Sequence, residues 1–367
     1  MKTFTCVCGQ LIFFDNTTCV ACHRELGFLP DRLVLNALET DPSGSFVGSG
    51  EGGSRSTRYR KCQNYEERSV CNWMIPEQEQ NQVFCLSCRL NEVIPDLSSE
   101  ENRSLWAMAE RTKRRLIYTL LKLNLPLSAK SVDFANGVAF RFLSDIHNQD
   151  GTLTKVLTGH DVGTITLNIA EADDAFREKV RMEMKEPYRT LLGHFRHEIG
   201  HYYWDRLIRD GKYLESFRGL FGDERADYGT ALQAYYANGA AADWRANYVS
   251  AYATAHPWED WAETWAHFLH MHDALEVADD FGLRGKSPRG ASFLQSAEQK
   301  GLRKRDKFGK TIQTWIELTI ALNAINRSMG LQDVYPFVLS PRAIDKLRFV
   351  SEVVSACGTQ SAAAQTA

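Results

Sequence analysis

The segment from Tyr188 to Leu207 reads YRTLLGHFRHEIGHYYWDRL and has the apolar periodicity of a helix. Within it, His197 and His201 are four residues apart and Glu198 follows the first of them. Side chains at this spacing project from one helix face about one turn apart, so both imidazoles can reach a single zinc ion. Glu198 then lies beside a water activated by the metal, where it can act as general base. The motif predicts the zinc site of a hydrolase on a helix of the fold.

Gly200 interrupts this helix against its propensity. A glycine inside a helix costs roughly 1 kcal/mol relative to alanine. We therefore expect another part of the protein to approach the backbone closely at Gly200.

A catalytic zinc with three protein ligands needs one more ligand beyond the two histidines. A metzincin would carry Gly at 204 and His at 207, but the sequence has Trp204 and Leu207, which excludes that class. An aspzincin would supply an Asp from a Gly-Thr-x-Asp-x-x-Tyr-Gly segment. The nearest stretch, GDERADYG at 222–229, has Arg225 in place of that Asp, and it leaves Asp227 or Glu224 as alternatives.

A better source of the third ligand is the stretch HPWEDWAETWAHFLHMH at 256–272. Glu259 and Glu263 are four residues apart there, on a predicted helix that Pro257 can start. One carboxylate can bind zinc, while the other, one turn along, supports a zinc-bound histidine.

The cysteines are concentrated at the N-terminal end, where eight of the nine lie between Cys6 and Cys88. Their spacing groups them into two quartets, Cys6, Cys8, Cys19 and Cys22, and Cys62, Cys71, Cys85 and Cys88. Four thiolates close a tetrahedral zinc without an open position, so each quartet predicts a structural zinc site that replaces a core too small to fold alone. Spacing does not decide whether the quartets pair locally or mix in space.

The organisation along the chain follows from breaks in these patterns. The Gly/Ser-rich stretch at 44–56 predicts a connector between two metal knuckles. Pro95 closes the cysteine-rich part, and Asp96 or Ser99 can cap the helix that follows. We expect a zinc-ribbon region over 1–96, a catalytic domain over 97–356 and a flexible tail over 357–367.

The predicted catalytic domain is mostly helical with a small β-sheet. Alternating polar and apolar residues predict a strand at 163–170, and a second strand is predicted at 138–142. Helical periodicity covers 188–210, 224–237, 257–275, 308–328 and 341–355. The fold class predicted for the whole chain is therefore α+β.

Nearly the whole chain resembles gluzincins, and more closely the bacterial family of zinc-binding metallopeptidases that carry an N-terminal zinc-ribbon region. The matching segments follow in order: SVCNWMIP, FCLSCRLNEVIPDL, TITLNIAEADD, PYRTLLGHFRHEIGHYYW, FGDERADYGTAL and YATAHPWEDWAETWAHFLH. The resemblance implies two zinc knuckles, each with four cysteine ligands, followed by a gluzincin-like metallopeptidase domain.

The resemblance also implies roles for individual residues. PWEDWAETWA is similar to the Glu-Phe-Phe-Ala-Glu segment of anthrax lethal factor, which implies Glu259 as zinc ligand and Glu263 as its support. A Tyr seven residues before the ligand Glu helps stabilise the oxyanion in that protein, and this offset lands on Tyr252. TITLNIAEADD fits the edge strand with which gluzincins hold an extended peptide by backbone pairing, and a plain sheet strand is the alternative.

Composition limits the partners and the compartment. Lys plus Arg number 43 against 46 Asp plus Glu, a net charge of -3, which implies no general affinity for nucleic acid or anionic membranes. The N-terminus lacks the long apolar region of a signal peptide, and no apolar run reaches the roughly 18 residues of a membrane helix. We therefore expect a cytoplasmic protein, with metal rather than disulfides at the cysteines.

Two functions from different classes fit the sequence. The first is a zinc metallopeptidase in which His197, His201 and Glu259 bind the catalytic zinc, Glu198 is the general base and Tyr252 assists at the oxyanion. It would hold one catalytic and two structural zinc ions, act on a peptide or protein substrate and bind a protein partner through the zinc ribbon. The second is a zinc-ribbon adaptor with a latent or inactive peptidase-like domain.

Overall fold

The computed structural model describes residues 2–50, 52–53, 56–148, 150–183, 189–285 and 306–365. The chain divides into two compact units, Met1–Val180 and Arg181–Ala367. The domain limits near residues 97 and 356 stay predictions. Some predicted segments fall partly outside the described residues: Tyr188 of the helix at 188–210, residues 51, 54 and 55 of the connector, and residues 366–367 of the tail.

The first unit begins with the cysteine-rich part, which folds into antiparallel β-structure. A hairpin comes first, followed by a sheet in which five strands pair in chain order. The hairpin strands are β1 (Phe4–Thr5) and β2 (Leu11–Ile12), and the sheet strands are β3 (Leu26–Leu29), β4 (Val34–Thr40), β5 (Phe46–Ser49), β6 (Tyr59–Lys61) and β7 (Met74–Pro76). Strand β5 lies inside the predicted Gly/Ser-rich connector, so part of that stretch belongs to the sheet.

Helices, among them the long α2, and a second sheet complete this unit. The four strands of the second sheet have the order β12-β13-β9-β8, and a separate hairpin joins β10 to β11. The elements are α1 (Gln63–Glu66), η1 (Cys88–Leu90), β8 (Asn91–Val93), α2 (Glu100–Lys122), β9 (Ala139–Leu143), β10 (Ile146–His147), β11 (Leu153–Thr154), β12 (Gly159–Asp161), β13 (Thr164–Asn168), η2 (Ile169–Ala172) and α3 (Asp174–Glu183).

The two predicted strands of this sheet are confirmed as β9 and β13, but the edge position predicted for the second is wrong. Strand β13 pairs with β12 on one side and with β9 on the other. Its backbone groups therefore already have partners within the sheet, and β12 occupies the edge. The short turn at Val162 and Gly163 folds β12 back onto β13, which the alternation of β13 alone does not reveal.

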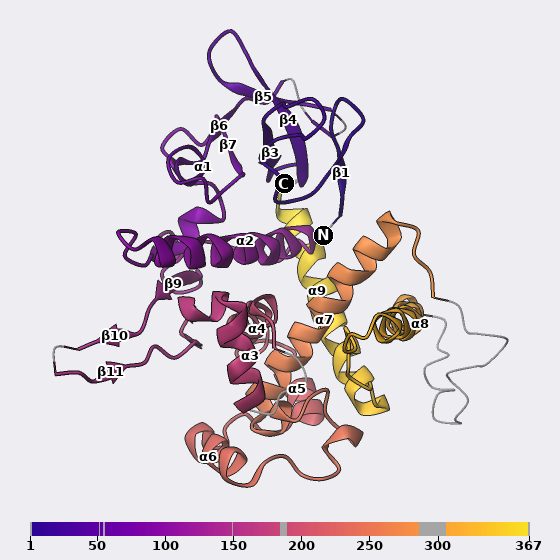
Figure 1. The fold of residues 1–367 in the computed structure, drawn as a ribbon. Helices are drawn as coiled ribbons and strands as arrows, with labels where there is room; N and C mark the ends of the chain where they lie inside the picture. Colours follow the sequence, from indigo (N-terminus) through magenta and orange to yellow (C-terminus); the bar gives the residue numbers. More distant parts are fainter. Residues whose placement is uncertain are drawn as a thin grey trace. The chain divides into compact units, whose positions relative to one another are not determined.

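Helix α2 lies between the two sheets of the first unit (Figure 1). Ser99 caps it by accepting a hydrogen bond from the Asn102 amide, as the sequence predicts. Toward the cysteine-rich sheet, the Tyr118 ring lies 5.4 Å from that of Phe14 and 6.0 Å from that of Phe28.

The same helix makes polar contacts in both directions. Arg115 forms an ion pair with Asp15 of the cysteine-rich part. On the side of the second sheet, the Lys113 ammonium group lies 5.6 Å and 5.5 Å from the ring centres of Phe140 and Phe142. Helix α2 is thus part of the hydrophobic core beneath both sheets.

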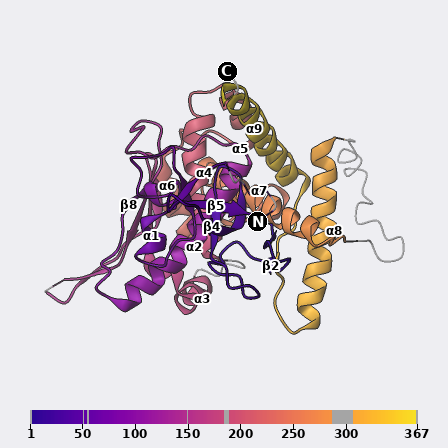
Figure 2. The ribbon, with the colours of Figure 1, turned by 90° about the horizontal axis from the view of Figure 1, so that it is seen from above.

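The second unit is helical and is built around a long central helix. Helix α7 packs against both α4 and α9, and the three lie side by side (Figures 1 and 2). The elements are α4 (Leu191–Leu207), α5 (Leu214–Phe221), α6 (Tyr228–Asn238), η3 (Trp244–Ala246), η4 (Tyr252–Thr254), α7 (Pro257–Asp280), α8 (Lys307–Ser328) and α9 (Pro341–Gln365). Each helix predicted in this part of the sequence is present.

Helix α9 extends to Gln365, through most of the segment predicted as a flexible tail. The alanines of SAAAQ have high helix propensity and prolong the preceding helix. No helix among the described residues is both long enough and apolar enough to cross a membrane.

Helix α7 approaches the backbone of α4 closely at Gly200. A Cβ atom at Gly200 would lie 3.1 Å from the Cα of Ala262 and 3.2 Å from the Cβ of Trp265. The indole of Trp261 also donates a hydrogen bond of 2.9 Å to the Gly200 carbonyl. The expectation that another element approaches this glycine is therefore confirmed, and the contact sets the spacing of the two helices.

We expect Gly200→Ala to destabilise the protein by about 1–3 kcal/mol, because the added methyl group must push α7 away from α4. Gly219→Ala is the matched control, since Gly219 is also helical and nothing lies within 4 Å of its added Cβ. There the gain in helix propensity should raise stability by up to about 1 kcal/mol. Thermal unfolding of both variants tests this, and a Gly200→Ala variant as stable as the control would contradict the packing argument.

Candidate metal centre

Helices α4 and α7 bring His197, His201 and Glu259 together. One ligand atom from each lies within 4.8 Å of the others. His197 Nε2 is 2.9 Å from Glu259 Oε2 and 3.2 Å from His201 Nε2, and His201 Nε2 is 3.4 Å from Glu259 Oε1. The two histidines belong to one face of α4, and Glu259 belongs to the first turn of α7.

The cluster has the chemistry and the dimensions of a zinc site. Zinc bonds of about 2.0–2.1 Å in a tetrahedron place the ligand atoms about 3.3 Å apart. The distance between the two imidazole nitrogens, 3.2 Å, and the distance from each of them to its nearest Glu259 oxygen, 2.9 Å and 3.4 Å, are close to this value, although the nearest oxygen differs for the two histidines. Two imidazole nitrogens and a carboxylate oxygen are a ligand set found in catalytic zinc sites.

Glu263 orients His197 from the side opposite the cluster. Its Oε1 lies 2.7 Å from His197 Nδ1, which leaves Nε2 directed at Glu259 and His201. The Ser250 hydroxyl donates to the other oxygen, Oε2, at 2.5 Å. A carboxylate that accepts the second N–H of a ligand histidine fixes its tautomer and raises its basicity.

The buried charges of the cluster depend on one another. Burial lowers the pKa of His197, but hydrogen bonds to Glu259 and Glu263 outweigh it and raise that pKa well above its usual range. Burial alone would raise the pKa of Glu259, but the charge of His201 and the hydrogen bond to His197 bring it well below its usual range. Because ligand histidines must be neutral, binding of a cation here competes with protonation of His197.

Glu198 and Tyr252 are the two other predicted site residues near the His/Glu cluster. Glu198 follows His197 on α4 and is partly exposed, and its carboxylate has no hydrogen bond to the described residues. The Tyr252 ring centre is 5.9 Å from that of His197. Burial and the charge of Glu259 raise the pKa of Tyr252 well above its usual range, so the phenol keeps its proton and can donate it in a hydrogen bond.

Tyr228 is a site residue that the sequence did not reveal. Its hydroxyl donates a 2.7 Å hydrogen bond to Glu259 Oε1. Asp227, beside it in the chain, instead caps α6 by accepting from the Thr230 amide. Glu224 accepts two hydrogen bonds from Arg218. The alternative ligands Asp227 and Glu224 are thus engaged elsewhere.

His256 has a structural position at the start of α7. Its Nδ1 accepts a hydrogen bond from the Trp258 amide at 3.1 Å, which caps the helix. Its Nε2 lies 3.1 Å from the Ala226 carbonyl, to which it donates. Both ring nitrogens are therefore used to hold α7 and the segment before α6 together.

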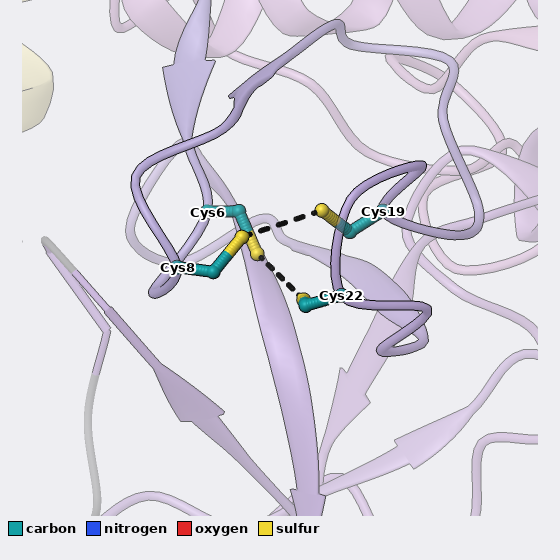
Figure 3. Close-up of side chains that lie close together, drawn as sticks. All are labelled: Cys6, Cys8, Cys19 and Cys22. Atoms are coloured by element: carbon teal, nitrogen blue, oxygen red, sulfur yellow. Dashed lines mark hydrogen bonds between the residues drawn. The ribbon is translucent and has the colours of Figure 1, made fainter.

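Each cysteine quartet assembles from its own segment, so the structure shows local pairing. Figure 3 shows the first quartet, in which the Sγ atoms of Cys6 and Cys22 are 3.7 Å apart, as are those of Cys8 and Cys19. Zinc bonds of about 2.3 Å to sulfur in a tetrahedron place the sulfurs about 3.8 Å apart. Hydrogen bonding from the backbone of Arg24 lowers the pKa of Cys22 to about 6, which favours the thiolate that zinc requires.

The second quartet has the same dimensions but lies deeper. Cys71 Sγ is 3.7 Å from the Sγ atoms of both Cys85 and Cys88. All four of its cysteines are buried, whereas Cys8 of the first quartet is exposed. Arg114 of α2 is buried nearby, and its positive charge opposes the net charge of -2 that four thiolates and one zinc would carry.

The sequence matches two family models. The one described as "Putative zinc-binding metallo-peptidase" matches residues 102–353, and a zinc-ribbon domain matches residues 3–99. Uncharacterized proteins of Mycobacterium bovis and Mycobacterium tuberculosis are each 42% identical over 356 residues, which cover 96% of this chain and 95% of theirs. No solved structure matches the chain significantly. Because the first model covers well over half of the sequence, the chain belongs to this zinc-binding metallopeptidase family and carries an N-terminal zinc ribbon.

Proposed function

We propose that this protein is a gluzincin-type peptidase that hydrolyses peptide bonds with zinc and a glutamate general base. The observation that carries the proposal is the convergence of His197, His201 and Glu259 on one point, with Glu198 beside them. A zinc ion bound by these three ligands would polarise the scissile carbonyl group and lower the pKa of the attacking water.

Three further side chains would carry out proton transfer, oxyanion stabilisation and ligand orientation. Glu198 takes a proton from the attacking water, whose oxygen bonds to the carbonyl carbon, and passes that proton to the nitrogen as the C–N bond breaks. The Tyr252 hydroxyl donates a hydrogen bond to the carbonyl oxygen as negative charge develops there. Glu263 keeps the His197 ring in the orientation that the site requires.

The N-terminal quartets have a different role in the proposal. Each would hold one structural zinc, since four thiolates leave no position for a substrate. Cysteines that bind zinc and form no disulfide suit a reducing compartment, which supports a location in the cytoplasm. The zinc ribbon would then bind a protein partner or recruit the peptide or protein substrate.

We expect His197→Ala to lower the zinc content by about one ion per chain, because it removes one of the three ligands of the His/Glu cluster. The two cysteine quartets should keep their metal. Zinc is measured by elemental analysis of the purified full-length protein, beside peptide hydrolysis by the same samples. The control is His23→Asn, because His23 is exposed, belongs to none of the three clusters and has a φ of 57°, which asparagine tolerates.

The results separate the two functions. Loss of one zinc together with hydrolysis supports the peptidase. Unchanged zinc content in His197→Ala would contradict the metal site. A wild type that binds the third zinc but cleaves no member of a peptide library would favour the adaptor with a latent peptidase-like domain.

A further inference from the structure

Helix α6 carries Tyr228 to the metal centre although the helix itself is hardly packed. None of its residues is buried, and Figure 1 shows it at the periphery of its unit. It follows Gly222, whose φ of 107° only glycine adopts readily, and it ends at Gly239, whose φ is 73°. Because none of its residues is buried, the position of this helix must depend on specific contacts.

Those contacts converge on the start of α7. The Tyr228 ring lies 5.3 Å from that of His256 and 5.8 Å from that of Trp258, both edge-on. His256 also holds the segment before α6 through its hydrogen bond to the Ala226 carbonyl. The Tyr228 hydroxyl is thereby directed at Glu259, which is 1% exposed.

The hydrogen bond distinguishes the two oxygens of Glu259. Oε1 accepts a hydrogen bond from the Tyr228 hydroxyl at 2.7 Å and lies 3.4 Å from His201 Nε2, while Oε2 lies 2.9 Å from His197 Nε2. Because the phenol takes up a lone pair of Oε1, Oε2 is the oxygen that is more available to a cation.

We propose that Tyr228 is a positioning residue that fixes Glu259 so that a single oxygen faces the metal. This inference rests on the proposed zinc site and adds a residue from a separate helix to it. A bidentate carboxylate would fill the position that a catalytic zinc keeps open for water or substrate. Tyr228 therefore favours both the orientation of the ligand and an open fourth position.

The test is the zinc affinity of Tyr228→Phe, which removes only the phenol oxygen. We expect the full-length variant to bind zinc at the His/Glu cluster roughly 10–100-fold more weakly than the wild type, the usual effect of losing a hydrogen bond to a metal ligand. Affinity is measured by competition with a chelator. Glu259→Ala, measured in parallel, identifies which of the released ions belongs to this cluster.

Tyr236→Phe is the matched control, because Tyr236 is on the same helix, is 59% exposed and donates no hydrogen bond to Glu259. Wild-type affinity in the control, with equal thermal unfolding of both variants, supports a positioning role. Equal affinity of Tyr228→Phe and wild type, or equal weakening in both Phe variants, would overturn it. If Glu259→Ala kept all its zinc, the metal site itself would be wrong, which is a different failure.

Discussion

Glu198→Gln is expected to lower peptide hydrolysis by at least about 10²-fold while the protein keeps its zinc and its fold, because an amide cannot accept the proton of the attacking water. Glu198 has no hydrogen bond to the described residues that this change would break. The helix α4 that carries it is anchored by neighbours such as Phe195 and Ile199, which are fully buried. The loss should therefore appear in kcat and not in stability.

The measurement uses a library of fluorogenic peptides, with zinc content and thermal unfolding recorded on the same samples. Glu215→Gln is the control, since Glu215 lies on the exposed side of α5 and, among the described residues, pairs only with Arg218. It should cleave as the wild type does. Wild-type cleavage by Glu198→Gln would show that another group accepts the proton.

The second large effect is expected for the double variant Cys85→Ser, Cys88→Ser. It leaves the second quartet with two thiolates, so the zinc there should be lost and the cysteine-rich sheet should unfold. Structural zinc binds with about 10–16 kcal/mol in comparable four-ligand sites, which exceeds the stability of a small domain. Because Cys85 is fully buried, the new hydroxyl would also lie where water cannot reach it.

Unfolding of the sheet should also destabilise α2, whereas the second unit should stay folded. The Tyr118 ring packs on Phe14 and Phe28, so loss of the sheet removes part of the core of α2. Near-ultraviolet circular dichroism follows the unfolding of the cysteine-rich sheet, and zinc content follows the metal. The ion of the second quartet should be lost, and the His/Glu cluster should keep its ion. Cys357→Ser is the control, since Cys357 belongs to neither quartet. Full zinc content in the double variant would contradict a structural role.

Short-range patterns predicted which side chains cluster in this protein. The i, i+4 spacing of His197 and His201 places both on one helix face whatever surrounds the helix, and the C-x2-C pairs are similarly local. Gly200 also predicted a close contact, because a glycine inside a helix is unfavourable unless another element approaches its backbone. Such signals need no knowledge of the tertiary fold.

The parts that the sequence did not predict depend on contacts between distant segments. The segment GDERADYG left Asp227 as an alternative ligand, but a residue that caps a helix turns its carboxylate toward the backbone of that helix. The next residue, Tyr228, points toward Glu259 instead. The interior place of β13 was missed for a similar reason, since alternation identifies a strand but not its neighbours.

The position of α2 under both sheets has a consequence for folding during synthesis. The cysteines of each quartet come from short segments, 6–22 and 62–88, so little chain entropy opposes their closure once zinc is present. The ion pair between Asp15 and Arg115 instead joins residues 100 positions apart. The core of the ribbon is therefore complete only after α2 has been translated, and zinc bound by the quartets would hold its loops in order during that interval.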